Sequence, residues 1–329
     1  MKLRILLLAA SIWPMVVGCT KPKPEVQPVR HPIVIDAEVR DWNTPHSPGS
    51  LLITDHYRIY TTIRRPPLRK YLPGLMEASH SRYLELTGLG DRESSKLMPM
   101  YVMGTRPEWA ALTTSRLGRR AELVLSITAG GYCYDGVCVL WDIGPRGTLS
   151  VAAHEGLHQF FSHRLSQSLP MWLEEGICVL AEGHQLRKGQ LVFTPKNNPS
   201  RITALRTAII DGHWVPTAKL LPMDAGDAVG TGISKKAIGY YGQVWALSMF
   251  IRSVPEYNAG MQRMIADAES GQMHRAMNLS AAALAKLKRY GRAYNKTIAA
   301  PLFKHYIDSD LEAFETQYLA YARKLAGLK

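Results

Sequence analysis

The fold is decided by one stretch of the chain, Thr148-Leu-Ser-Val-Ala-Ala-His-Glu-Gly-Leu-His-Gln-Phe-Phe-Ser-His163, which predicts a helix. Histidines four residues apart on a helix lie about 40° apart around its axis and one turn along it, so the imidazoles of His154 and His158 can converge on one metal ion. Glu155 flanks that face, where its carboxylate would reach a metal-bound water rather than the metal. Apolar residues follow a different side of the helix, which we expect to be buried: Leu149, Ala153, Leu157 and Phe160.

The five residues from His154 to His158 have the HExxH arrangement of zinc hydrolases. Catalytic zinc takes three protein ligands and keeps a fourth position for water, so a third ligand is needed. The longer HExxHxxGxxH pattern is excluded, because Phe161 and Arg164 stand where it requires glycine and histidine. Downstream, a second predicted helix over 170–183 begins with Leu169-Pro-Met-Trp-Leu-Glu-Glu-Gly176.

With these two motifs the sequence resembles the gluzincin (thermolysin-like, peptidase MA-like) zinc metallopeptidases, and it looks like an uncharacterised bacterial lipoprotein member. The third ligand of that family often lies in a Trp-Leu-x-Glu-Gly motif, which Trp172 to Gly176 match. The resemblance therefore implies that Glu175 is the third ligand and Glu174 the variable position. The alternative for Glu175 is a solvated helix carboxylate.

The resemblance covers about residues 50–255, although only the zinc motifs within it are specific. It includes Gln159-Phe-Phe161 and, on a later helix, Tyr241-Gly-Gln-Val-Trp245. Two departures stand out. The 16 residues between the second histidine and the expected glutamate ligand are slightly fewer than usual. Gly156 lies inside the helix, where glycine costs about 1 kcal/mol relative to alanine, and close packing against a neighbouring strand or helix would account for it.

The resemblance implies a zinc metallopeptidase with one zinc ion per chain. Zinc bound by neutral His154, neutral His158 and the Glu175 carboxylate would keep a net charge of about +1, lower the pKa of its water to about 7 and polarise the scissile carbonyl. Glu155 would accept the proton of that water as general base and pass it to the leaving amine. The expected substrate is a peptide or protein of the cell envelope.

Two further side chains are candidates for supporting roles. Tyr241, or its neighbour Tyr240, would donate a hydrogen bond to the oxyanion, because gluzincins often place a tyrosine or histidine there. Tyr241 and Trp245 equally fit a core-packing stripe. Glu182, seven residues after Glu175, would orient a histidine from the same side of its helix, or would be a solvated carboxylate.

Two rival functions remain at this point. One is a catalytically silent scaffold or binding lipoprotein that keeps the metallopeptidase fold. Glu155 disfavours it, because a purely structural site has no use for a base beside the metal. The other is a zinc amidase acting on cell-wall material, which the motif alone does not exclude.

The N-terminus predicts export. Residues 1–18 have the form of a lipoprotein signal peptide, with Lys2 and Arg4 before the 13 nearly continuous apolar residues from Ile5 to Val17. That stretch is too short to span a bilayer, which takes about 20 residues, and suits a signal peptide.

The leader ends in Val16-Val17-Gly18-Cys19, which resembles the bacterial lipoprotein signal box. The resemblance implies cleavage before Cys19, lipidation of its thiol and anchoring in a lipid bilayer. The alternative is an ordinary signal peptide with an incidental cysteine. Residues 19–49 are then a proline-rich tether whose last part, 30–49, is a loose lead-in. We expect the protein in the bacterial cell envelope, at the periplasmic face of the outer membrane.

Composition narrows the class of protein. The 329 residues are 46% hydrophobic and 20% charged, which excludes wholesale disorder. The 40 basic and 27 acidic residues give a net charge of +13, which becomes 13 − 2 = +11 once the leader is removed. No nucleic-acid-binding signature accompanies this charge, so nucleic acid is not an expected partner. This positive charge is only weak evidence for binding to anionic surfaces of the envelope.

The expected fold is α+β, with a thermolysin-like core in which a small mixed sheet packs on the HExxH helix. This catalytic lobe spans 50–185, and a mostly helical lobe spans 186–329. Strands or hairpins are expected over 51–63, 98–103, 130–141 and 190–193. Outside a loop-rich segment at 194–238, helices are expected over 74–86, 107–117, 148–163, 170–183, 239–252, 258–269, 280–293 and 309–326, the last with a capping box of Ser309 and Glu312.

The hairpin carries two open questions. Asp135-Gly136 predicts its turn, and the arm Val137–Trp141 would be either the edge strand that binds extended peptide or an internal strand. Cys133 and Cys138 flank the turn and could form a disulfide, although Cys178 could pair with either of them instead. Two other histidines near the motif, His163 and His184, lack ligand spacing and are expected at the surface or at helix ends.

Overall fold

The structure is a computed structural model that describes residues 30–45, 47–92, 96–127, 130–223, 235–277, 280, 282 and 291–329. The predicted leader, Cys19 and the tether as far as residue 29 lie outside the described residues, as does most of the helix expected over 280–293. The fold is α+β, with a mixed sheet and many helices, as predicted at this level. Within the described ranges, no helix has both the length and the apolar character needed to cross a bilayer.

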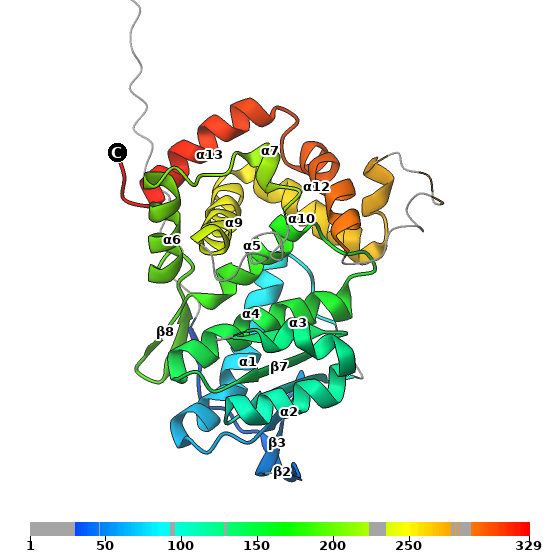
Figure 1. The fold of residues 1–329 in the computed structure, drawn as a ribbon, viewed down its shortest axis with the longest axis vertical. Helices are drawn as coiled ribbons and strands as arrows, with labels where there is room; N and C mark the ends of the chain where they lie inside the picture. Colours follow the sequence, from blue (N-terminus) through cyan, green and yellow to red (C-terminus); the bar gives the residue numbers. More distant parts are fainter. Residues whose placement is uncertain are drawn as a thin grey trace, which may run out of the picture.

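The larger sheet has six strands in the order β2-β3-β4-β5-β7-β6; its strands β2, β3 and β7 are labelled in the lower half of Figure 1. In sequence order they are β2 (Glu38–Asn43), β3 (Pro48–Ile53), β4 (Tyr57–Thr61), β5 (Met98–Met103), β6 (Gly131–Tyr134) and β7 (Val137–Trp141). β4, β5 and β7 run parallel, whereas β2, β3 and β4 pair antiparallel, as do β6 and β7. Parallel neighbours require a crossover, and helices provide it between these strands.

Helices cover both faces of this sheet. α1 (Pro66–Thr87) and α4 (Pro145–Arg164) pack on one face, and α2 (Arg106–Leu117) and α3 (Ala121–Leu125) pack on the other, joined by the short η1 (Gly118–Arg120). α4 is the predicted HExxH helix. Its expected apolar side is buried at Leu149, Ala153, Leu157 and Phe160.

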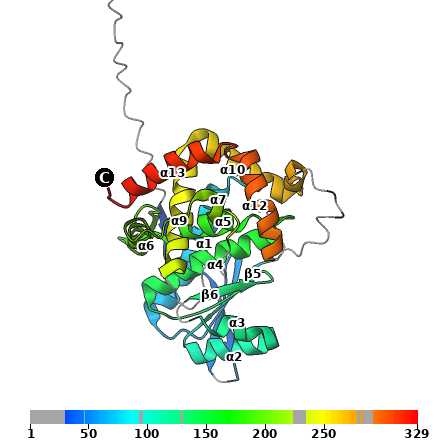
Figure 2. The ribbon, with the colours of Figure 1, turned by 45° about the horizontal axis from the view of Figure 1, so that its top comes forward.

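The rest of the chain is mostly helical. Its elements are α5 (Met171–Glu182), α6 (Pro199–Ile210), α7 (Thr217–Leu220), α9 (Lys235–Ser253), α10 (Pro255–Ser270), η2 (Met273–Met277), α12 (Arg292–Tyr306) and α13 (Leu311–Leu325). The largest hydrophobic core lies among these helices, around α9, and includes the apolar faces of α4 and α5. Figures 1 and 2 show α4 and α5 at the junction between the sheet and the C-terminal helices, so this junction positions the HExxH helix.

A second, three-stranded antiparallel sheet joins distant parts of the sequence. It has the order β1-β9-β8, with β1 (Arg30–Pro32), β8 (His184–Arg187) and β9 (Gln190–Phe193). The lobe boundary expected at 185/186 therefore falls inside β8. The loose lead-in expected over 30–49 is wrong, because it contains β1 and β2 and the start of β3. Nearly all residues of β2 are exposed, so this edge strand has no apolar alternation that would reveal it.

The start of α1 was also predicted wrongly. The helix begins at Pro66 rather than near residue 74, with Pro66 and Pro67 in its first turn, where proline is well tolerated. Pro73 lies inside the helix. Position 74 has room only for glycine, because a Cβ there would lie 2.2 Å from the backbone oxygen of Ile33.

Three other expectations are corrected. The segment 194–238 contains α6 and α7, and α6 begins at Pro199 with an Asn198 side-chain cap, so the proline that suggested a loop starts a helix instead. The last helix is capped by Asp310, whose carboxylate accepts two backbone N–H groups, and not by Ser309. The helix over 292–306 was largely missed.

The hairpin is confirmed, but one of its two interpretations is wrong. Asp135 and Gly136 form its turn, both with positive φ (52° and 71°), as a two-residue hairpin loop requires. β7 lies between β5 and β6 and is therefore an internal strand. The edge strand at this side of the sheet is β6.

Candidate metal centre

Two helices bring the three predicted ligands together. His154 and His158 project from α4, and Glu175 projects from α5. The Nε2 atoms of His154 and His158 lie 3.5 and 3.7 Å from the Oε2 atom of Glu175. These separations are too long for ordinary hydrogen bonds. They are close to the spacing of about 3.4 Å between two ligands held tetrahedrally at 2.0–2.2 Å from one zinc ion.

Close helix packing fixes this arrangement at two glycines. A Cβ at Gly156 would lie 2.5 Å from the hydroxyl of Tyr83 on α1, and a Cβ at Gly176 would lie 2.2 Å from the hydroxyl of Ser248 on α9. The Tyr83 hydroxyl donates a hydrogen bond to the backbone oxygen of Ala153 (2.7 Å). Packing against a neighbouring helix therefore accounts for the unusual glycine of the HExxH motif.

Each histidine is also held by a second carboxylate. The Nδ1 atom of His154 lies 3.0 Å from Oε1 of Glu182, and the Nδ1 atom of His158 lies 2.9 Å from Oε1 of Glu174. An imidazole that donates its Nδ1–H to a carboxylate keeps the lone pair of Nε2 for a metal ion. Of the two interpretations of Glu182, the structure therefore supports the orienting role.

Glu174, Arg201 and Asn198 are site residues that the sequence did not reveal. Glu174 stands at the position treated as variable. The Arg201 guanidinium donates to both carboxylate oxygens of Glu182 (2.6 and 3.0 Å), and the Asn198 amide donates to one of them (3.0 Å). An adjacent pair of glutamates early in α5 was a signal for Glu174. Arg201 had no such signal, because it lies in the segment expected to be loop-rich.

This centre has an excess of negative charge that a cation would balance. With neutral imidazoles, the four carboxylates of Glu155, Glu174, Glu175 and Glu182 and the guanidinium of Arg201 give the centre a net charge of 1 − 4 = −3. Net charge held away from water is costly unless a countercharge is close. The Oε2 atom of Glu175 is buried without a hydrogen-bond partner among the described residues. A divalent cation would both balance the negative charge and bind the Oε2 atom of Glu175. Two imidazoles with a carboxylate are a ligand set that suits zinc.

The carboxyl groups differ in pKa. Burial raises the pKa of Glu155 above its ordinary value, and the two histidines only partly offset this effect. Burial also acts on Glu182, but Arg201 and the adjacent imidazole outweigh it and lower the pKa to about 2. The pKa of Glu175 is likewise lowered, because the two imidazoles outweigh its burial. Glu155 is therefore the carboxyl group best suited to gain and lose a proton.

The histidines respond to the same charges. Burial alone would lower the pKa of His154, but the neighbouring Glu175 and Glu182 carboxylates outweigh burial and raise it to about 9. The pKa of His158 is raised as well, against the effect of burial, by the Glu175 carboxylate and by the Glu174 carboxylate that its Nδ1–H contacts. The centre therefore attracts positive charge, either as protons on its imidazoles or as a cation.

The centre borders a cleft of about 760 Å³, a volume typical of small-ligand sites. His154, Glu155 and Tyr241 contribute to its wall, together with Arg201 and the edge of β6 at Gly131. Other polar lining residues are Arg146, Ser150, Glu182, His184, Gln185, Asn197, Asn198 and Ser200.

The two candidate tyrosines lie in different surroundings. Tyr240 is in the hydrophobic core, whereas Tyr241 is half-buried at the cleft, with the Arg201 guanidinium 5.1 Å from its ring centroid. The nearby charge of Glu175, together with burial, raises the pKa of Tyr241 well above its ordinary value. Its hydroxyl therefore keeps its proton and remains a hydrogen-bond donor.

The remaining predicted residues lie outside the ligand set. His163 is exposed on α4, and His184 lies just after α5, where it contributes to the cleft wall. Cys133 and Cys138 face each other across β6 and β7, yet both are free thiols, as is Cys178, so none of the possible disulfides is formed. The Cys138 thiol instead donates to the backbone oxygen of Glu155 (3.0 Å). Burial raises the pKa of Cys178 to about 12, which keeps this thiol protonated.

Comparison with known proteins adds no relative. The chain matches no protein-family model, no curated protein and no solved structure. What the centre does must therefore be argued from its own geometry.

Proposed function

We propose that the chain is a gluzincin-type zinc metallopeptidase that hydrolyses peptide bonds. The observation that carries this proposal is the convergence of Nε2 of His154 and Nε2 of His158 on Oε2 of Glu175, beside Glu155. Three protein ligands are typical of catalytic zinc, whereas structural zinc usually has four, and the ligand His154 lines the cleft together with Glu155.

The zinc ligands, Glu155 and Tyr241 would each have a separate role in the hydrolysis. Zinc bound by the three ligands would supply a Lewis acid that polarises a carbonyl and lowers the pKa of a water molecule to about 7. The Glu155 carboxylate would accept a proton from the attacking water and donate it to the leaving nitrogen. The Tyr241 hydroxyl would donate a hydrogen bond to the substrate's carbonyl oxygen as negative charge develops on it.

An extended peptide suits the wall of this cleft. β6 is an edge strand, so one side of its backbone is not paired within the sheet, and Gly131 on that strand lines the cleft. A peptide that adds to this edge as a further strand would form main-chain hydrogen bonds and lie beside Glu155. β6 thus takes the role that the sequence suggested for Val137–Trp141.

The N-terminal sequence supports a cellular location for this activity. We propose that lipid on Cys19 anchors the mature chain in a bilayer of the bacterial envelope, at the periplasmic face of the outer membrane. The short apolar leader and its cysteine-terminated end support this location. The substrates would then be envelope peptides or proteins.

A cleavage assay with a diverse peptide library tests the proposed activity. We expect fragments, detected by mass spectrometry, that a zinc chelator abolishes and added zinc restores. His158→Ala should abolish cleavage, and His163→Ala, an exposed histidine on the same helix, should retain it. Cleavage that resists chelation and His158→Ala would contradict the proposal. Cleavage of cell-wall fragments in place of peptides would identify a zinc amidase, and bound zinc without any hydrolysis would identify a scaffold.

A further inference from the structure

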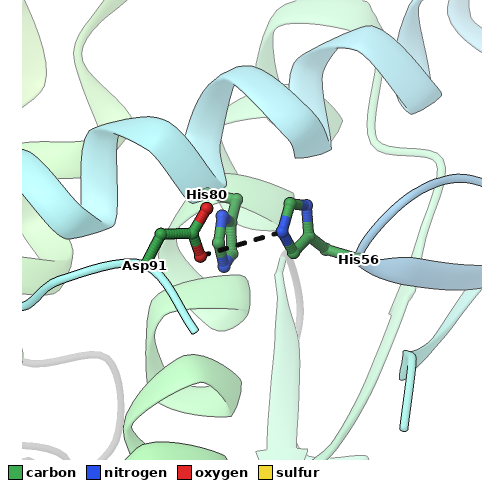
Figure 3. A group of neighbouring side chains, drawn as sticks. All are labelled: His56, His80 and Asp91. Carbon is green, nitrogen blue, oxygen red and sulfur yellow. Dashed lines mark ion pairs between the residues drawn. The ribbon is translucent and has the colours of Figure 1, made fainter. Parts of the chain in front are cut away.

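A second group of metal-ligating side chains lies on the N-terminal half, outside the cleft wall. His56 lies in the turn between β3 and β4, His80 lies on α1, and Asp91 follows α1. One ligand atom from each lies within 4.8 Å of those of the other two. Figure 3 shows the ring of His80 beside the line that joins His56 to Asp91.

Glu77 orients the ring of His56 and fixes which of its nitrogens carries the proton. Its Oε2 atom lies 2.6 Å from Nδ1 of His56, and its Oε1 atom accepts the backbone N–H of the same residue (3.0 Å). This contact makes Nδ1 the protonated ring nitrogen and leaves the lone pair on Nε2. The Nε2 atom lies 4.0 Å from Oδ1 of Asp91. A carboxylate that holds the distal nitrogen of a histidine is the usual arrangement around protein-bound metal ions.

His80 provides the second imidazole. Its ring stacks on that of His56, with 3.6 Å between centroids and 17° between planes. Only 6% of His80 is exposed. This largely buried imidazole therefore offers a second ring nitrogen to the group.

The charges and accessibility of the group favour a cation from solvent. The carboxylates of Glu77 and Asp91 lie 2.6 and 4.0 Å from the two ring nitrogens of His56, so negative charge faces the group. The Asp91 side chain is 60% exposed and that of His56 is 26% exposed, so an ion can reach the group from water. Coordination of one ion by both imidazoles requires one ring to turn out of the stack, because a metal ion lies near the plane of each imidazole that binds it, and requires Asp91, which follows the end of α1, to move inward.

We infer that His56, His80 and Asp91 form a second zinc site, which fastens the β3–β4 turn to α1 and to the loop after it. Two imidazoles and one carboxylate suit zinc and similar transition metals, and do not suit calcium or magnesium, which prefer oxygen ligands alone. Such an ion would stabilise the N-terminal half, because metal binding to the folded chain adds to the free energy of unfolding. This site does not depend on the proposed peptidase activity.

Zinc content of four forms of the mature chain separates the two sites. After equilibration with excess zinc and gel filtration, we expect about two ions in the wild type, about one in His154→Ala, about one in His80→Ala and none in the double variant. The second site is refuted if His154→Ala holds no zinc. If the first site alone fails, the wild type and His154→Ala hold about one ion each and His80→Ala holds none.

His80→Ala removes a buried side chain and can destabilise the fold, so a second test changes the exposed ligand Asp91. In the His154→Ala background, Asp91→Asn should weaken zinc binding at least about 10-fold, measured by calorimetric titration. The matched control is Asp55→Asn, which removes the same charge from an exposed position beside His56 and should bind zinc as the parent does. Zinc should also raise the Tm of His154→Ala, and this shift should shrink with Asp91→Asn. Equal affinity in Asp91→Asn and Asp55→Asn would overturn the assignment.

Discussion

The Nδ1 atom of His158 lies 2.9 Å from Oε1 of Glu174, the residue immediately before the proposed zinc ligand Glu175. Neighbouring residues on a helix point about 100° apart. α5 therefore presents Glu175 to the Nε2 side of the imidazole and Glu174 to its Nδ1 side. One helix thus supplies both the expected ligand and the carboxylate that orients another ligand.

Loss of this orienting carboxylate should weaken metal binding. Glu174→Ala should lower zinc affinity about 10–100-fold, because the His158 ring loses the acceptor that fixes its orientation and raises its basicity. Competition with a chromogenic chelator measures this affinity. The control is Glu122→Ala, an exposed glutamate on α3, which should bind zinc as the wild type does. Equal affinity in both variants would exclude an orienting role for Glu174.

The two adjacent tyrosines should respond differently to loss of their hydroxyls. Tyr241→Phe should keep zinc and lower kcat by about 10²–10³-fold, as expected for removal of a donor to the developing oxyanion. Tyr240→Phe is the matched control, since this side chain lies in the core, and it should change stability more than turnover. Peptide cleavage and thermal unfolding of both variants provide the comparison. An unchanged kcat in Tyr241→Phe would leave that residue with a packing role only.

The glycine within the HExxH motif should be sensitive to a single methyl group. Gly156→Ala would place Cβ 2.5 Å from the Tyr83 hydroxyl and 2.8 Å from Cε of Met76. Overpacking of this kind costs about 1–3 kcal/mol, against a gain of about 1 kcal/mol in helix propensity. We therefore expect a net loss of stability in urea denaturation. Gly239→Ala on α9 has an ordinary 3.6 Å contact and should be neutral or stabilising. If both variants gain stability, α1 and α4 are less closely packed than described.

Glu108, which belongs to neither proposed metal site, should make stability depend on pH in the acid range. Burial raises its pKa, but hydrogen bonds from Ser47, Thr62 and Thr105 outweigh burial and hold the pKa below 4.5. Since the folded pKa is the lower one, this carboxylate contributes stability above about pH 4.5, and the contribution is lost as pH falls through the folded pKa. Urea unfolding from pH 7 to 3 should show a flatter pH dependence for Glu108→Gln. Parallel curves for variant and wild type would contradict this role.

The sequence predicted elements best where periodicity and local signals coincide. The HExxH helix, its buried side and the Asp-Gly hairpin were predictable because helical spacing and turn chemistry are local properties. β2 was not predictable, since it is an exposed edge strand. Pro66, Pro73 and Pro199 were misleading for a common reason: the same residue type begins a helix, lies within one or ends one according to its neighbours.

The candidate site was predictable only in its local part. The spacing of His154 and His158 indicated that they would converge, and the family resemblance indicated Glu175. Arg201 contacts Glu182 from α6, a helix that lay in the expected loop. The pair of His56 and His80 was beyond sequence reasoning as well, because their stacking depends on how α1 packs beside the β3–β4 turn.

We propose that Glu155 acts as the base of a zinc-dependent hydrolysis. The most direct measurement compares wild type and Glu155→Gln at equal, verified zinc content, using a peptide that the wild type cleaves. We predict unchanged zinc binding and a fall in kcat of about 10²–10⁴-fold, the usual contribution of a general base. Undiminished turnover by zinc-loaded Glu155→Gln would contradict the claim.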